Sequence, residues 1–420
     1  MTKNSLNRDI YKPRLQSLHV SEPSFHKFFW PPVIPELGDV VKKYIDEQKP
    51  LSIADNSGIY DELESKLKKI FNTKHCLLVS SGTIGLYSVF YSLDLKEDDE
   101  VINTVYSYHA TASPLLHFNA KIVYCDVEED TGNIDAYEIE KHISSKTKAI
   151  VSNDMWGHPC DKDNITKLCK KYNILYIEDC SHAHFSEYKS KFTGTFGAAS
   201  VFSLQGNKLL SGGEGGVILT DSDEIFEKCV LLGHNLKRPQ YDVKNIFYNK
   251  ILRTGFGLKF RMHPISAVII NYILDNYCFD WIHSRRKVLD YFAAGINSIP
   301  NMKAPVIKDY VTSMGAYYGF KPFVAFDSMK INKSEFLEIC KSFHLDVSEP
   351  GSKPFYHYDL FLSPEKYTGY KHKTNINDNF EKAERYYINR VSIPTFTFDD
   401  DLSTVDYYIN VFEKISKEYF

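Results

Sequence analysis

Short apolar runs alternate with helical patterns through the first half of the chain. The runs at 75–80, 100–105, 121–127, 148–152 and 174–177 are typical of buried strands, and helical patterns lie at 61–71, 84–93, 135–142 and 163–172. Strands that alternate with helices at this spacing indicate an α/β fold with a mostly parallel sheet and crossover helices. Ligands of such sheets bind at the carboxyl ends of the strands, so the turns that follow the strands are the expected position of a site.

A chain of 420 residues is too long for one hydrophobic core, so we expect more than one domain. Residues 1–24 are predicted to form an N-terminal arm, 25–290 a large domain and 291–420 a smaller C-terminal α+β domain. The remaining expected elements are helices at 261–278, 284–295, 333–343 and 404–420 and strands at 320–326 and 391–394.

Composition argues against several function classes. The net charge of −4 gives no reason to expect nucleic acid or an acidic membrane as a partner. No apolar run approaches the roughly 20 residues of a membrane span, and the N-terminus lacks the apolar core of a signal peptide. The eight cysteines contain no CxxC pair, which favours free thiols in a reducing cytoplasm.

Lys208 has unusual surroundings. It lies between apolar runs at 200–204 and 216–219, and two leucines and a glycine-rich stretch at 212–216 follow it. Burial disfavours an ammonium, so we expect a lowered pKa and a nucleophilic amine suited to Schiff-base chemistry with an aldehyde cofactor. The plain alternative is a surface lysine before a flexible turn. Nucleotide-binding loops are set aside, because neither G-K-[ST] nor G-x-G-x-x-G spacing is present.

Polar groups follow two of the predicted strands. Ser81, Gly82 and Thr83 lie between strand and helix, where their N–H groups and hydroxyls suit a phosphate or form a plain helix N-cap. Asp179 ends an apolar strand, where a carboxylate either meets a cation such as a pyridinium nitrogen or caps the next helix. His182, three residues on, is near enough to reach the same ligand from another side.

Two further side chains complete the candidate set. Tyr108 follows another predicted strand and can stack on a flat ring, although an aromatic residue there is more often part of the core. Ser203, five residues before Lys208, adds a hydroxyl within reach of a phosphate. Together the candidates offer an anion cradle, a stacking face, a carboxylate for a ring nitrogen and a lysine for an aldehyde. That combination matches pyridoxal 5′-phosphate.

The sequence resembles the DegT/DnrJ/EryC1/StrS family of pyridoxal-phosphate sugar aminotransferases. The matching motifs keep the family's order over roughly 50–280: S-S-G-T at 80–83, S-Y-H-A-T-A at 107–112, W-G-H-P-C-D at 156–161, I-E-D-C-S-H-A-H at 177–184, F-S-L-Q-G-N-K at 202–208 and G-E-G-G at 213–216. The resemblance implies an α/β fold of PLP-transferase type I, with a mostly parallel, seven-stranded-type sheet in the large domain and a smaller C-terminal α+β domain.

The resemblance also implies roles for the candidates. Lys208 corresponds to the lysine that forms the Schiff base with the cofactor, and Asp179 to the partner of the pyridine nitrogen. His182 stands where the family has Gln or His against the phenolic oxygen, and Tyr108 takes the place of the stacking aromatic residue.

The remaining implied roles concern the cofactor's phosphate. Gly82, Thr83 and Ser203 resemble the family's contacts to it within one chain. Lys259 departs from the family pattern, because many members have at this position an asparagine that reaches the phosphate of the neighbouring subunit. A lysine can contact that phosphate as a point charge. The implied assembly is a homodimer with shared active sites.

The implied activity is transfer of an amino group from glutamate or glutamine to a nucleotide- or phosphate-activated keto-sugar, in amino-sugar, polysaccharide or antibiotic biosynthesis. Relatives that dehydrate sugars carry histidine in place of the lysine, so Lys208 argues against that reaction. The Asp, His and Lys set argues against a non-catalytic regulatory protein. Five residues offer ligand atoms for a metal ion: His158, Cys160, Cys180, His182 and His184. Their spacing matches no standard zinc pattern, which argues against a metal site.

Overall fold

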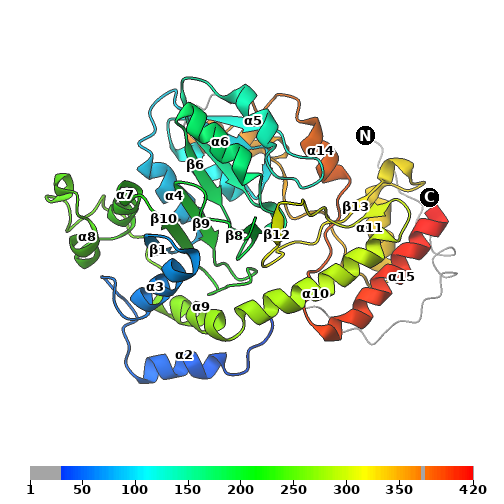
Figure 1. The fold of residues 1–420 in the computed structure, drawn as a ribbon, viewed down its shortest axis with the longest axis horizontal. Helices are drawn as coiled ribbons and strands as arrows, with labels where there is room; N and C mark the ends of the chain where they lie inside the picture. Colours follow the sequence, from blue (N-terminus) through cyan, green and yellow to red (C-terminus); the bar gives the residue numbers. More distant parts are fainter. Residues whose placement is uncertain (1–29, 370–373, 420) are drawn as a thin grey trace.

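A seven-stranded sheet lies at the centre of the structure, a computed structural model that describes residues 30–369 and 374–419 (Figure 1). Its strand order is β1-β10-β9-β6-β5-β2-β4. Strand β10 is antiparallel to both of its neighbours, and the other six strands run in one direction. The strands are β1 (His75–Val79), β2 (Glu100–Thr104), β4 (Lys121–Cys125), β5 (Thr147–Asn153), β6 (Leu175–Asp179), β9 (Ala199–Ser203) and β10 (Gly216–Thr220). The prediction of a mostly parallel α/β sheet is confirmed.

Helices cover both faces of this sheet. Successive side chains of a strand point to opposite faces, so in β1 Leu77 and Val79 pack on one side and Cys76 and Leu78 on the other. The first face is covered by α4 (Gly82–Ser92) and α7 (Asp223–Gly233), and the second by α3 (Ile59–Phe71), α5 (Ala136–His142), α6 (Lys162–Tyr172) and α9 (Pro264–Asn276). Burial on both faces explains why the strands are apolar along their whole length.

Several helices begin and end at the residues that favour caps. The hydroxyl of Ser81 accepts the N–H of Ile84 (3.2 Å) at the start of α4, and Asp161 caps α6 in the same way. Asn72 and Asn173 adopt left-handed conformations and end α3 and α6. Helix α9 begins later than the predicted residue 261, because Pro264 occupies its first turn.

A second hydrophobic core lies beyond the sheet. Helix α10 (Cys278–Asn297) runs from α9 to this core, where it lies beside α15 (Leu402–Tyr419) (Figure 1). The expected strands at 320–326 and 391–394 are wrong in extent: β13 (Phe323–Val324) forms, and the rest of the pairing consists of isolated bridges, Phe320 with Ile393, Phe323 with Arg390 and Ser348 with Ser392. Pro322 and Pro394 cannot donate backbone hydrogen bonds to a longer ladder. The other elements of this half are α11 (Lys333–Ser342), β11 (Met302–Lys303) and β12 (Val311–Ser313), which pairs with β7 (Glu187–Tyr188) beside β8 (Lys191–Phe192).

The segment from residue 353 to 388 returns to the sheet. Strand β14 (Lys353–Pro354) pairs with β3 (Tyr106–Ser107), and Phe355, Phe361 and Tyr386 join the core that contains α4. This segment also holds α12 (Asp359–Leu362), α13 (Glu365–Thr368) and α14 (Glu381–Ile388). Helix α10 crosses the expected boundary at residue 290, so that division stays a prediction, and the expected arm at 1–24 lies outside the described residues.

Two helices lie at the periphery of the large sheet. Helix α2 (Leu37–Asp46) packs on α9, and α8 (Lys237–Asp242) lies at the opposite end of the molecule from α15 (Figure 1). Over residues 30–369 and 374–419, no helix has the length and apolar character that a bilayer span requires. All eight cysteines are buried free thiols.

A buried charge network ties α6 to the ends of β5 and β6. The ammonium of Lys162 lies 2.7 Å from Asp154 Oδ1 and 2.9 Å from Glu178 Oε2, and all three side chains are fully buried. Burial lowers the pKa of Lys162, but the two carboxylates outweigh it and hold that pKa well above its usual value. One cation therefore contacts both carboxylates at the strand ends that border the candidate site, and it offsets one of their two negative charges.

Replacing Lys162 by methionine should destabilise the protein by about 3–5 kcal/mol, because Asp154 and Glu178 would stay buried without their cation. The measurement is the urea midpoint of unfolding followed by circular dichroism. Lys171→Met is the matched control, since Lys171 pairs with Glu140 on the surface and its loss should leave the midpoint essentially unchanged. Equal shifts for the two variants would contradict the role given to the network.

Candidate active site

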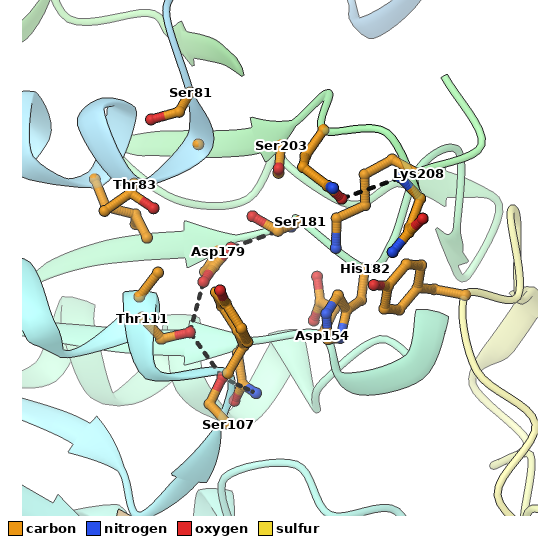
Figure 2. A pocket seen from close by; sticks show the side chains of 18 of the residues that line it. Ser81, Thr83, Ser107, Thr111, Asp154, Asp179, Ser181, His182, Ser203 and Lys208 are labelled. Atoms are coloured by element: carbon orange, nitrogen blue, oxygen red, sulfur yellow. Dashed lines mark hydrogen bonds between the residues drawn. The ribbon is translucent and has the colours of Figure 1, made fainter. Parts of the chain in front are cut away.

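The carboxyl ends of β1, β5, β6 and β9 surround a cavity of about 450 Å³ (Figure 2). Every candidate residue except Lys259 lines it: Gly82, Thr83, Tyr108, Asp179, His182, Ser203 and Lys208. Lys259 is exposed on the loop before α9. The lining also includes residues that the sequence analysis did not single out, namely Asn153, Asp154, Ser181, Gln205, Asn207, Glu214 and Tyr318.

Lys208 is held inside this cavity. Its side chain is 7% exposed, and its ammonium lies 3.7 Å from the centre of the Tyr318 ring. Burial lowers the pKa of Lys208 to about 7, and the attraction of Asp179 opposes this only in part. Near neutral pH a large fraction of the amine is therefore uncharged and able to act as a nucleophile.

Asp179 enters the same cavity from the end of β6. Its carboxylate is buried, and it accepts hydrogen bonds from the hydroxyl of Thr111 (2.6 Å) and the N–H of Ser181 (3.1 Å). Thr111 in turn lies 2.7 Å from the Ser107 hydroxyl, and Figure 2 shows this chain of hydrogen bonds along one wall. The bonds orient the carboxylate, but in the part of the chain that the structure describes no cation pairs with it. Turns follow Asp179, so it does not cap a helix.

The start of α4 lies close to two neighbouring strands. A Cβ atom on Gly82 would lie 2.8 Å from Ser203 Cβ, and one on Gly216 would lie 2.5 Å from the Ser81 carbonyl, so only glycine permits this approach. The approach places the first turn of α4, with Thr83, and the end of β9, with Ser203, on neighbouring parts of the cavity wall (Figure 2). Helix N-termini with such hydroxyls bind anions.

His182 lies in an aromatic stack at the side of the cavity nearest the C-terminal half. Its ring is 4.1 Å from that of Tyr318 and 5.2 Å from that of Trp156, measured between centres. Burial lowers the pKa of His182 well below its usual value, and the nearby ammonium groups of Lys208 and Lys321 lower it further. The imidazole is therefore neutral at pH 7.

The sequence indicated one aromatic residue of the cavity, Tyr108, but not another, Tyr318. Tyr108 is 51% exposed at the edge of the cavity, so it is free to face a ligand rather than being part of the core. Tyr318 covers Lys208 and stacks on His182, yet no pattern in the sequence marks it, because it reaches the site from the loop after β12, which is not a strand of the central sheet.

The histidines considered as metal ligands have other partners. Nε2 of His184 lies 2.8 Å from the Ser203 carbonyl oxygen, and its Nδ1 accepts the N–H of Leu210. Nδ1 of His158 lies 2.7 Å from the Pro159 carbonyl oxygen. Within the described ranges the one close group of ligand-type atoms is Asp154, Glu178 and Cys180, and Lys162 contacts both of its carboxylates. That group is therefore part of the ion network.

The reactivity of Lys208 should follow its lowered pKa. With trinitrobenzenesulfonate, labelling of Lys208 should rise as pH passes through about 7, because the reagent attacks only the uncharged amine. Lys171 serves as the control within the same digest, since Glu140 raises its pKa above that of a free lysine and its labelling should need a far higher pH. Peptide mass mapping measures both. Labelling of the two residues over the same pH range would contradict the assignment.

A model of the DegT/DnrJ/EryC1/StrS aminotransferase family matches residues 52–406. An uncharacterised protein of Methanocaldococcus jannaschii is 31% identical over 402 residues, which cover 93% of this chain and 98% of that protein. The GDP-perosamine synthase of Escherichia coli O157:H7 is 31% identical over 266 residues, covering 63% of this chain and 71% of the synthase.

Among solved structures, the E. coli GDP-4-keto-6-deoxy-D-mannose-3-dehydratase with bound hydrated PLP aligns with a TM-score of 0.75 at 20% identity, over 92% of this chain and 100% of that one. This likeness confirms the prediction of a PLP-transferase fold of type I. The match over most of the sequence shows that the chain belongs to the DegT/DnrJ/EryC1/StrS aminotransferase family.

Proposed function

We propose that this protein is a pyridoxal 5′-phosphate-dependent aminotransferase that converts a keto-sugar into an amino-sugar. The observation that carries the proposal is a pair of buried groups in one cavity: an amine whose pKa lies near 7, on Lys208, and a carboxylate without a cation, on Asp179. Family membership supports the reaction class, and the related GDP-perosamine synthase supports a nucleotide-activated sugar as the substrate.

The residues present fit this cofactor. Lys208 would bond its aldehyde carbon, and Asp179 would face its ring nitrogen. The cradle that Gly82 keeps open beside Ser203 would hold its phosphate, with Thr83 as a further contact. Asn153 also lines the cavity, and its Oδ1 is a buried acceptor without a hydrogen-bond partner among the described residues. This atom could accept a hydrogen bond from a ligand.

The stacking and phenolic-oxygen contacts would come from Tyr108 and His182, which also line the cavity. The bound cofactor supplies an electron sink for the carbon that gains or loses the amine. The cavity has a volume of about 450 Å³. The lining residues that have no role toward the cofactor would position the substrate and exclude water.

The protein's own side chains perform the proton transfers. Lys208 can take a proton from the substrate carbon and return it, because an amine with a pKa near 7 is an effective acid and base at neutral pH. Asp179, fixed by Thr111 and Ser181, holds a proton on the ring nitrogen. The neutral ring of His182 can form a hydrogen bond without adding charge.

Lysine at position 208 favours transamination over dehydration, because its amine would take back the cofactor's aldehyde when the amino-sugar leaves at the end of the full catalytic cycle. We expect glutamate or glutamine as the donor. The buried free thiols agree with the expected reducing cytoplasm.

A screen of keto-sugar nucleotides and keto-sugar phosphates with glutamate or glutamine tests the proposal. Mass spectrometry should detect an amino-sugar from at least one of them. Lys208→Ala should abolish turnover, and Asp179→Asn should lower kcat by orders of magnitude while leaving the unfolding midpoint largely unchanged, because the ring nitrogen would lose its proton. A cofactor-loaded protein that turns over none of these substrates would instead favour the regulatory alternative.

We propose further that the protein is a homodimer whose sites are shared. Lys259 is exposed and lies outside its own chain's cavity, so a partner's cavity is where it could meet a phosphate. Exposed apolar side chains gather in the nearby part of the chain; Phe247 is 82% exposed, and the others are Leu236, Tyr241, Ile246 and Leu258. Such a patch is typical of an interface between subunits.

A mixing experiment tests the shared site. Lys208→Ala chains and Lys259→Ala chains should each be impaired alone, but mixed dimers should regain part of the activity, because both changes fall in one site and the other site stays intact. The measurement is turnover after co-refolding, with sedimentation to confirm dimers. A fully active monomer would contradict the proposal, and a dimer without rescue would remove Lys259 from the neighbouring site.

A further inference from the structure

A second cavity adjoins the first on the side of the C-terminal half. Its volume is about 330 Å³, and its lining includes Trp156, Lys321 and Ser392. Asn207 and Tyr318 line both cavities. A substrate that reacts at Lys208 therefore lies next to this second space.

Lys321 is a buried cation at this cavity. Its side chain is 7% exposed, its ammonium lies 4.4 Å from the centre of the Trp156 ring, and it donates a hydrogen bond to the Ser392 hydroxyl. Burial lowers the pKa of Lys321 to about 7, and no carboxylate offsets that effect. A buried ammonium without a counter-charge costs free energy that a hydroxyl and a ring face recover only in part.

Several other buried cations among the described residues pair with carboxylates. Lys162 lies between two carboxylates, and Arg238 pairs with Glu64 at 2.8 Å. Arg285 and Arg390 lack such a pair but donate to backbone carbonyl oxygens. Lys321 donates to a hydroxyl and faces a cavity. A buried amine that contacts a hydroxyl and faces a cavity is expected where a ligand supplies the negative charge.

Two carboxylates stand at the exposed edge of the second cavity. Glu349 is neutralised by an ion pair with Lys333 at 2.6 Å. Asp346 is exposed, so solvent and salt screen its charge. Neither carboxylate raises the pKa of Lys321, so this amine is left to take up a proton when an anion enters the cavity and pairs with it.

We infer that Lys321 and Ser392 form a subsite for an anionic oxygen group of the substrate, positioned one cavity away from Lys208. The inference rests on the proposed function, because it assigns both cavities to one substrate. One ammonium and one hydroxyl suit a singly charged group, so the side-chain carboxylate of a glutamate donor is favoured over the more highly charged diphosphate of a nucleotide-sugar.

Calorimetric titration of the cofactor-loaded protein with glutarate and, separately, with GDP tests this subsite without any turnover. Lys321→Met should weaken glutarate binding at least tenfold, Lys321→Arg should retain most of it, and Ser392→Ala should lie between them. Loss confined to GDP would place a phosphate in the subsite instead. Lys189→Met, which removes a surface lysine paired with Asp163, is the matched control.

Stability provides a readout that separates this role from a structural one. Lys321 has no buried partner that its loss would leave unpaired, so Lys321→Met should unfold at a midpoint no lower than that of the unmodified protein. Saturating glutarate should raise the midpoint of the unmodified protein but not that of the variant. Binding of both probes unchanged in Lys321→Met, or no binding to the unmodified protein, would overturn the inference. The binding of glutarate is measured without turnover. If the sugar screen alone fails, the effect of Lys321→Met on glutarate binding still tests the subsite.

Discussion

The burial of Lys208 opposite Asp179 is the constraint on which the rest of the site depends. Each group is costly to bury: the pKa of Lys208 falls to about 7, and Asp179 is held by a hydroxyl and an N–H instead of a cation. The fold keeps both groups at the carboxyl edge of the sheet, where a ligand that brings an aldehyde and a basic ring nitrogen would compensate both.

The surrounding structure supports this pair in two ways. Gly82 and Gly216 let the first turn of α4 approach β9 and β10, which creates the anion cradle beside Ser203. On the other side, Lys162 pairs with both carboxylates at the ends of β5 and β6, so the strand ends beside Asp154 and Asp179 are held in a fixed geometry. The large sheet domain thus supplies both the reactive groups and their rigid support.

Sequence patterns were informative wherever function depends on local order. The alternation of strands and helices predicted the parallel sheet, and the turns after the strands placed seven candidates around one cavity. The patterns could not place Tyr318 over Lys208 or Thr111 against Asp179, because those contacts join segments about 70 to 110 residues apart. The patterns did not indicate Lys321 either, because its burial against Trp156 and Ser392 arises only in the packed structure.

A crystal structure of the protein reduced with borohydride in the presence of pyridoxal 5′-phosphate tests the central claim most directly. The account predicts a covalent bond between the cofactor and Lys208 Nζ, with the ring nitrogen within hydrogen-bond distance of Asp179 and the phosphate at the start of α4. Attachment to another lysine, or a ring nitrogen that faces away from Asp179, would contradict it.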